Sequence, residues 1–477
     1  MDLKEILVVG LCLWQLFMVS MVSGNAIFEV EHKFKGGKRT LKELRDHDLH
    51  RHGRLLATIE LPLGGDSSPT GTGLYFTKIQ IGNPAKEYHV QVDTGSDMMW
   101  VHCNGCEGCP KETRIEGIKL QTYDPKSSSS AKVIKCDNQQ CTMIYQRTPD
   151  SCKSDMLCQF EVHYGDGSST SGYFVEDSIN YKIPSNQSST GNSNVVFGCG
   201  TKIGDSDSPL KVDGIIGFGQ ANSSVISQLA AAGKVTKKFS HCLDNKKGGG
   251  ILAVGELVEP KLNAAPIVEK QAHYYVALKS IDVGGDVHEF SKGLFSSERG
   301  AMIDSGTTLG YLPNDIYEMT QNKIFSKQPK LEIETEEGGF KCFKYSGNVD
   351  DDFPKIVLNF KGSLSLTAHP HEYFFPLKDG RWCLGWQAGT FQSRDGSDVI
   401  ILGDMLLQNK LVYYDLENQN IGWTEYDCSS SIKLKDDKSG NVHDVAAQNL
   451  SSDGSLISGM SLLSAILLAL INMLCCF

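Results

Sequence analysis

The sequence is poor in basic residues, in proline and in aromatic side chains. Its 46 Lys and Arg residues are outnumbered by 57 Asp and Glu residues, for a formal charge of -11, so a basic nucleic-acid-binding protein is excluded. The 40% hydrophobic content excludes a disordered chain. With 48 glycines against 15 prolines and 9% aromatic residues, the composition favours a turn-rich globular protein of two or three lobes over a helical bundle or a polytopic membrane protein.

Several catalytic signatures are also missing. The sequence has no Gly-x-Ser-x-Gly motif and its 13 histidines are scattered, which argues against Ser/His/Asp hydrolysis. The glycine run at 248–250 lacks the Lys-Ser/Thr that completes a phosphate-binding loop. We therefore expect no cofactor and no nucleic-acid partner.

The chain begins with a segment typical of secreted proteins. Lys4 precedes an apolar block at 6–21, and small residues at 22–24 suit a signal peptidase, so residues 1–24 are predicted to be a signal peptide. Two acidic residues make the start less basic than usual, and an uncleaved anchor is the alternative.

Residues 25–70 are interpreted as a pro-segment. Residues 25–58 carry eight Lys or Arg side chains against five acidic ones, whereas the rest of the chain is acidic. A basic, helix-prone leader would cover a negatively charged site until acid weakens the attraction. A solvated charged helix without that role is the alternative.

The C-terminal end is apolar. Residues 456–477 contain no charged side chain, and the last Lys or Arg is Lys438. A membrane-spanning helix would keep basic residues on its cytoplasmic side, whereas small residues before an apolar end are typical of a GPI attachment signal. We predict a stem at 431–454 and a removed tail at 455–477, so that a GPI lipid anchors the protein in the outer leaflet of the plasma membrane. An ordinary C-terminal membrane helix is the alternative. The attachment candidates are Ser452, Asp453 and Gly454.

An internal repeat divides the body of the chain into two halves. Residues 90–96 (Val-Gln-Val-Asp-Thr-Gly-Ser) and 301–307 (Ala-Met-Ile-Asp-Ser-Gly-Thr) both combine an apolar run with Asp, a hydroxyl residue, Gly and a second hydroxyl residue. The run is typical of a buried strand, and the residues after it are typical of a tight turn. Apolar segments that contain Gly follow at 213–219 and 399–404 and again match each other.

Two all-β lobes with few, short helices are therefore expected. Their predicted bounds are 71–260 and 261–430. Alternating patterns predict strands at 75–81, 274–281 and 410–415. The best helix candidates are 223–232 and 313–325, where Pro313 suits a first helical position.

Lobes of similar plan can bring Asp93 and Asp304 together at their junction. Closely spaced carboxylates share a proton and titrate as a coupled pair. One carboxylate can then activate a water while its protonated partner hydrogen-bonds the substrate carbonyl, which hydrolyses an amide without a covalent intermediate. One Asp-Thr-Gly alone would indicate only a turn, but two copies in matching surroundings predict a catalytic pair. The hydroxyls expected to hold the carboxylates coplanar are those of Thr94, Ser96, Ser305 and Thr307.

A third motif lies at residues 162–168, Val-His-Tyr-Gly-Asp-Gly-Ser. Together with the repeat, it resembles the pepsin-like aspartic proteases, and the resemblance extends from about residue 74 to residue 427. It implies a bilobal all-β fold, hydrolysis of protein or peptide substrates, and a flap, which is a β-hairpin that closes over the substrate. The flap tyrosine would be Tyr164, with Trp100 as its hydrogen-bond partner. The implied flap and substrate-binding residues are Tyr164, Gly165, Asp166, Trp100, Gly95, Ser96, Gly306, Thr307 and Thr308.

Further motifs resemble the plant, nucellin-like branch of this family. They are found at 197–200, at 239–244 and in a cysteine-rich insertion after Trp100. The GPI-type end is similar to that of the membrane-anchored members, which implies a monomeric endopeptidase on the extracellular face of the plasma membrane. Ser305 stands where many relatives carry Thr, but it keeps the hydroxyl. The alternatives are a catalytically inactive pepsin-fold binding or inhibitor protein and a structural surface glycoprotein.

Twelve of the 15 cysteines lie in the body of the chain and predict disulfides formed in an oxidising compartment. The CxxCxxC spacing at 103–109 also suits zinc, but the signal peptide favours oxidation, so no metal is expected. The family's second-lobe bridge implies that Cys342 pairs with Cys383. The pairing stays open for Cys103, Cys106, Cys109, Cys136, Cys141, Cys152, Cys158, Cys199, Cys242 and Cys428. The sequons that could carry glycans on surface loops are Asn186, Asn222 and Asn449.

Overall fold

The computed structural model describes residues 58–145, 152–165, 167–184, 189–204, 211–269, 271–289, 300–389, 391, 398–436 and 440–450. The predicted signal peptide, most of the predicted pro-segment and the predicted GPI tail lie outside these residues. Within the described ranges, no helix is long and apolar enough to cross a membrane.

Strands dominate the regular structure, and the described helices are short. The strands before residue 260 are β1 (Ile59–Asp66), β2 (Leu74–Ile81), β3 (Lys86–Asp93), β4 (Trp100–Glu107), β5 (Lys132–Val133), β6 (Gln159–His163), β7 (Ser169–Ile183), β8 (Ser189–Ile203), β9 (Gly214–Gly217), β10 (Lys238–Leu243), β11 (Gly250–Val254) and β12 (Glu256–Glu259). The later strands are β13 (Ala264–Pro266), β14 (Tyr275–Val276), β15 (Leu278–Val283), β16 (Asp286–Glu289), β17 (Ala301–Ile303), β18 (Gly310–Leu312), β19 (Ile333–Thr335), β20 (Lys341–Lys344), β21 (Ile356–Phe360), β22 (Ser365–Ala368), β23 (Phe374–Pro376), β24 (Arg381–Leu384), β25 (Trp386–Ala388), β26 (Ile400–Leu402), β27 (Lys410–Asp415), β28 (Asn420–Glu425), β29 (Ser431–Lys435) and β30 (Val442–Ala446). The helices are α3 (Gln139–Tyr145), α4 (Val225–Ala231), α5 (Asn314–Ser326), α6 (Val349–Asp352), α7 (Pro370–Tyr373) and α8 (Asp404–Leu407).

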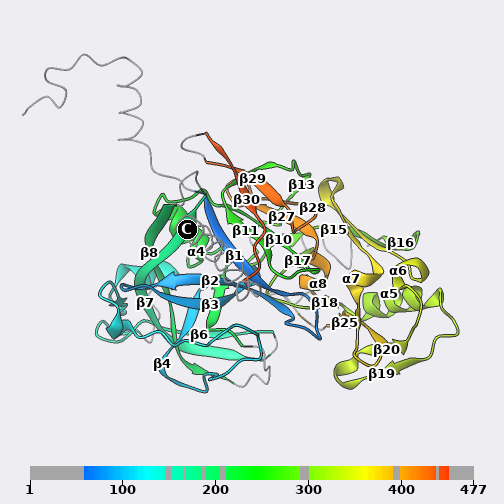
Figure 1. Cartoon of the computed structure of the whole chain (residues 1–477), viewed down its shortest axis with the longest axis horizontal. Helices are drawn as coiled ribbons and strands as arrows, with labels where there is room; N and C mark the ends of the chain where they lie inside the picture. Colours follow the sequence, from blue (N-terminus) through cyan, green and yellow to red (C-terminus); the bar gives the residue numbers. More distant parts are fainter. Residues whose placement is uncertain are drawn as a thin grey trace, which may run out of the picture. The chain divides into compact units, whose positions relative to one another are not determined.

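The largest sheet joins the two halves of the chain. Its fourteen strands include β13, β28 and β27 from the second half, and β27 pairs with β10 of the first half. The strands β27, β10, β11 and β1 are consecutive in this sheet and lie side by side in Figure 1. Four smaller sheets hold the remaining strands. The predicted all-β bilobal fold is confirmed, but the sheets do not divide at the predicted boundary between residues 260 and 261.

Local sequence signals explain where several elements begin. The strands predicted at 75–81 and 410–415 are β2 and β27, whereas the strand predicted at 274–281 is broken into β14 and β15. Helix α4 begins after Ser224, whose Oγ accepts a hydrogen bond from Ser227 N at 3.3 Å and so caps the helix. Helix α5 confirms the second candidate, but it begins at Asn314, so Pro313 lies at the N-cap and not at the predicted first helical position.

Two segments outside the predicted lobes are part of the folded body. Strand β1, which the sequence analysis assigns to the pro-segment, pairs with both β2 and β11. The predicted stem forms the hairpin β29–β30, which pairs with β12 and buries Ile432, Leu434 and Val445. The chain then returns to β1, where Leu450 N donates to Leu63 O at 2.9 Å. The folded body therefore includes β1 and the β29–β30 hairpin.

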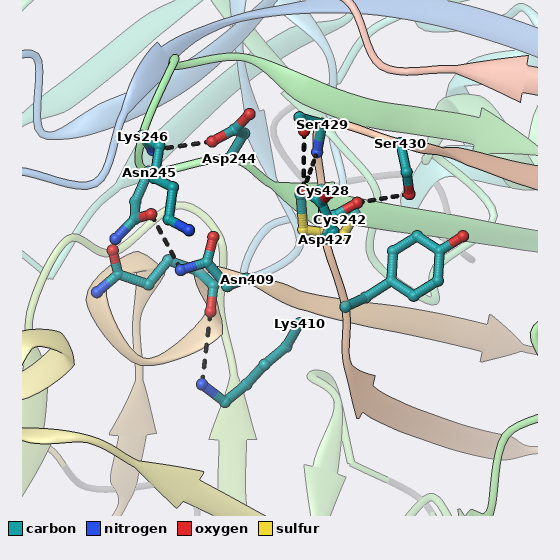
Figure 2. The surroundings of a disulfide bond; sticks show 12 residues. Cys242, Asp244, Asn245, Lys246, Asn409, Lys410, Asp427, Cys428, Ser429 and Ser430 are labelled. Atoms are coloured by element: carbon teal, nitrogen blue, oxygen red, sulfur yellow. Dashed lines mark hydrogen bonds between the residues drawn. A yellow bond between two sulfur atoms is a disulfide. The ribbon is translucent and has the colours of Figure 1, made fainter.

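All twelve cysteines of the body form disulfides, including those of the CxxCxxC segment. Within the described residues, no group of three or more His, Cys, Asp or Glu side chains could hold a metal ion. Figure 2 shows the bridge that links β10 to the segment after β28. The pairs are Cys103–Cys199, Cys106–Cys109, Cys136–Cys152, Cys141–Cys158, Cys242–Cys428 and Cys342–Cys383.

Candidate active site

Asp93 and Asp304 lie at the ends of two strands that each have a parallel neighbour. Asp93 is the last residue of β3 and lies beside Gly217 of β9. Asp304 follows β17, and its backbone N donates to Leu402 O of β26 at 3.1 Å. In each half, the strand of the apolar segment that contains Gly (β9 or β26) therefore lies beside the strand that leads to the aspartate of the same half.

The Asp93 carboxylate is buried and held on both oxygens. Gly95 N donates to its Oδ1 at 2.8 Å, and Ser96 Oγ donates to its Oδ2. Burial and the neighbouring Asp304 carboxylate, which is hydrogen-bonded to it, raise the pKa of Asp93 to about 7. Two adjacent buried carboxyl groups cannot both ionise easily, so the pair holds one proton in mildly acidic solution.

Asp304 is held by the equivalent groups of the second half. Gly306 N donates to its Oδ1 at 2.8 Å, and Thr307 Oγ1 donates to its Oδ2 at 2.7 Å. Both turns need glycine because each glycine lies against the opposite carboxylate. A Cβ on Gly95 would collide with Asp304, and a Cβ on Gly306 would collide with Asp93.

Thr94 and Ser305 connect the two aspartate turns. Thr94 Oγ1 donates to Ile303 O at 3.2 Å and accepts from Ser305 N at 3.0 Å. Ser305 Oγ donates to Val92 O at 3.2 Å and accepts from Thr94 N at 3.3 Å. These two hydroxyls do not contact the carboxylates themselves; they bond to backbone groups of the opposite half and lock the two turns together.

Asp404 is a third carboxyl group near the pair, which the sequence analysis did not single out. Its side chain is buried at the start of α8, and neither of its oxygens has a hydrogen-bond partner in the described part of the chain. Burial, followed by the charges of Asp304, Asp93 and Asp66, raises the pKa of Asp404 well above its ordinary value. The group is therefore neutral in the folded protein in mildly acidic solution.

Replacing Asp404 by Asn is expected to flatten the dependence of stability on pH. The unfolded chain loses the Asp404 proton near pH 3.8 and the folded chain only at much higher pH, so the wild type loses stability as the pH rises above about 4. The variant has no carboxyl group to titrate at this position, so it should not show this loss. Denaturant unfolding at about pH 4 and pH 7 measures this difference. Parallel pH dependences of the two proteins would contradict it.

The predicted flap is the hairpin of β6 and β7. Trp100 Nε1 donates to Tyr164 Oη at 2.6 Å, which is the contact that the resemblance implies. At the tip, a Cβ on Gly165 would lie 3.3 Å from the ring of Phe391, so the hairpin reaches toward the second half. Asp166 lies outside the described residues. Phe391 is an additional candidate for the wall of the site.

The remaining predicted residues occupy varied positions. Thr308 Oγ1 donates to Gly73 O and so ties the second aspartate turn to the start of β2. Asn222 is exposed. Asn449 is half-buried, and its Nδ2 donates to Lys247 O. Outside the described part of the chain lie Asn186, Ser452, Asp453 and Gly454.

Two family models match the chain in succession. The Xylanase inhibitor N-terminal family matches residues 75–256, and the Xylanase inhibitor C-terminal family matches residues 273–425. Aspartic proteinase 36 of Arabidopsis thaliana is 47% identical over 94% of both chains. The chain belongs to the plant pepsin-like aspartic proteinase family. Aspartic proteinase 39 of the same plant is 44% identical to this chain, again over 94% of both chains.

More distant similarities support the same fold. Aspartic proteinase nepenthesin-1 of Nepenthes gracilis is 27% identical to this chain. The match covers 84% of this chain and 90% of nepenthesin-1. Among solved structures, conglutin gamma from lupine seeds has a TM-score of 0.62 at 20% identity, over 78% of this chain and 96% of that chain. The basic 7S globulin from soybean has a TM-score of 0.60, also at 20% identity, over 77% and 96%.

Proposed function

We propose that the protein is an endopeptidase that hydrolyses peptide bonds with a water molecule activated by Asp93 and Asp304. The observation that carries this proposal is the buried carboxyl pair, whose environment raises the pKa of Asp93 to about 7. In the singly protonated pair, the ionised carboxylate takes a proton from water while the neutral carboxyl donates to the substrate carbonyl. The proton then passes to the leaving amine, and no covalent intermediate forms.

The substrate would be a protein or peptide in an extended conformation beneath the β6–β7 hairpin. The hydrogen bond between Trp100 and Tyr164 supports this role, because it holds the tyrosine ring of a hairpin that can close over the pair. Relatives named aspartic proteinases, at 44% and 47% identity, support a peptide substrate.

Hydrolysis of an unfolded protein tests this proposal. The secreted protein, treated with acid to release the leader, should cleave the substrate between about pH 3 and 6. A statine-type transition-state analogue should abolish the cleavage, because its hydroxyl mimics the attacking water. A folded, leader-free protein that cleaves nothing would contradict the proposal.

An inactive binding or inhibitor protein is the second candidate. It is favoured by the names of the two matching family models, which describe a xylanase inhibitor. Both aspartates, their hydrogen bonds and the contact between Tyr164 and Trp100 argue against it, since a binding role needs none of them. Absence of cleavage, together with binding to a xylanase, would favour this candidate.

Surface anchoring completes the proposal. The protein would be secreted, released from its basic leader, and held as a monomer on the outer face of the plasma membrane by a GPI lipid attached near residues 452–454. The absence of charge at 456–477 supports this. Phosphatidylinositol-specific phospholipase C should then release the protein from intact cells, whereas retention on the cells would contradict the GPI anchor.

A further inference from the structure

The cysteine-rich insertion after Trp100 has no place in the mechanism above, yet part of it is attached to the base of the flap. Helix α3 lies in this insertion, and the bridge between Cys141 and Cys158 joins it to the residue directly before β6. Both cysteines are fully buried. A covalent bond therefore connects α3 to the start of the first flap strand.

Non-covalent contacts strengthen this attachment. Tyr145, the last residue of α3, donates from its Oη to Gln159 O at the start of β6. Its ring lies edge-on to Phe174 of β7, with a centroid distance of 6.1 Å. In the backbone, Ile134 N donates to Phe174 O at 2.9 Å, and Phe174 N donates to Cys158 O at 2.8 Å. Both flap strands are thus held at their base.

One face of the flap leads from this base to the tip. Side chains two residues apart on a strand point to the same face, and Phe160, Val162 and Tyr164 are spaced in this way. Phe160 is buried in an apolar cluster with Trp100 and Cys141, and both Val162 and Tyr164 pack against the same cluster. Trp100 Nε1 also donates to Tyr164 Oη at 2.6 Å. The base and the tip of the flap therefore share one packed cluster.

We propose that Cys141, Cys158 and Tyr145 are positioning residues for peptide hydrolysis, which fix the base of the flap so that Tyr164 stays in the position from which the flap closes over the substrate. This inference rests on the proposed function. A flap with a free base would occupy its binding-competent position for a smaller fraction of the time, and the apparent affinity for substrate falls by that fraction. Once substrate is bound, the flap is closed in either case, so kcat should change little.

Removing the bridge tests the inference, and a second bridge provides the matched control. Cys136 and Cys152 are 16 residues apart, and Cys141 and Cys158 are 17 apart, so loop closure predicts similar losses of stability for the two double Cys→Ala variants. Without the Cys141–Cys158 bridge, we expect KM for a defined peptide to rise about five- to tenfold and kcat to stay within about twofold. The control variant should keep both within about twofold. Equal KM values in the two variants would overturn the inference.

A milder variant covers the case in which the protein does not fold without the bridge. Tyr145→Phe removes only the hydroxyl that bonds to Gln159 O, and KM should rise about threefold. Tyr426→Phe is its control, because Tyr426 Oη also donates to a backbone oxygen, that of Ser431, in the second half of the chain. The control should leave KM unchanged. Equal KM values in these two variants would likewise overturn the inference.

Hydrogen exchange gives a readout that does not depend on activity. In the substrate-free protein, the backbone amides of residues 159–165 should exchange faster without the Cys141–Cys158 bridge, and in Tyr145→Phe, than in the wild type and the two controls, because a fixed base suppresses local opening. Unchanged exchange would overturn the inference. If the wild type cleaves no peptide, the proposed function fails, and the exchange rates still decide whether this attachment fixes the flap.

Discussion

Replacing Asp93 by Asn is expected to lower the rate of peptide hydrolysis by about 10²–10⁴-fold, and the same loss is expected for Asp304→Asn. Asparagine has nearly the same shape, so the contacts from the neighbouring turn can largely remain, but it can neither share the proton nor accept one from water. The loss should appear in kcat and in kcat/KM together, because the missing interaction belongs to the transition state.

A matched control separates this loss from a general effect of charge. Asp137 is an exposed aspartate in the same half of the chain, so Asp137→Asn removes a carboxylate without touching the pair and should keep full activity. Steady-state kinetics on one defined peptide, with thermal melting to show that each variant is folded, measure the difference. Comparable activity of Asp93→Asn and the wild type would exclude the aspartate mechanism.

Removing the bridge shown in Figure 2 is expected to cause the largest loss of stability. Cys242 and Cys428 are 186 residues apart in sequence and are both buried in the apolar cluster beneath the β29–β30 hairpin. Closing so long a loop restricts the unfolded chain strongly, and the double Cys→Ala variant should lose about 4–5 kcal/mol of unfolding free energy.

The bridge between Cys106 and Cys109 provides the comparison. These residues are only three apart, so their double Cys→Ala variant should lose about 2 kcal/mol or less. Denaturant unfolding of both double variants at one pH measures the two losses. If the variant without the long-range bridge lost less unfolding free energy than the variant without the short one, restriction of the unfolded chain would not be the main contribution of these bridges to stability.

The sequence was sufficient for the features that repeat. Each aspartate turn is a local pattern of an apolar strand, Asp, a hydroxyl residue and Gly, and the two copies indicate a pair even before any fold is known. The flap and its contact between Trp100 and Tyr164 were accessible only through the resemblance to a family, since nothing in the chain itself connects residues 64 positions apart.

Residues whose roles arise from long-range pairing could not be found in this way. Asp404 stands in an ordinary helix-start context, and its place near the pair appears only in the fold, where its backbone N donates to Thr307 O of the second aspartate turn. Likewise, the segment at 431–450 has the polar composition of a linker, yet alternate side chains such as Ile432 and Leu434 pack under β12. A two-residue apolar period in so short a segment is a weak signal.

The pH dependence of kcat/KM for the wild type, measured on a defined peptide between about pH 3 and 8, tests the paired-aspartate mechanism most directly. Because burial and Asp304 raise the pKa of Asp93 to about 7, the pair keeps its single proton in mild acid and loses it as the pH rises through about 7. We therefore expect activity to be greatest in mild acid and to fall as the pH rises through about 7. Activity that keeps rising above pH 7 would contradict hydrolysis by this pair.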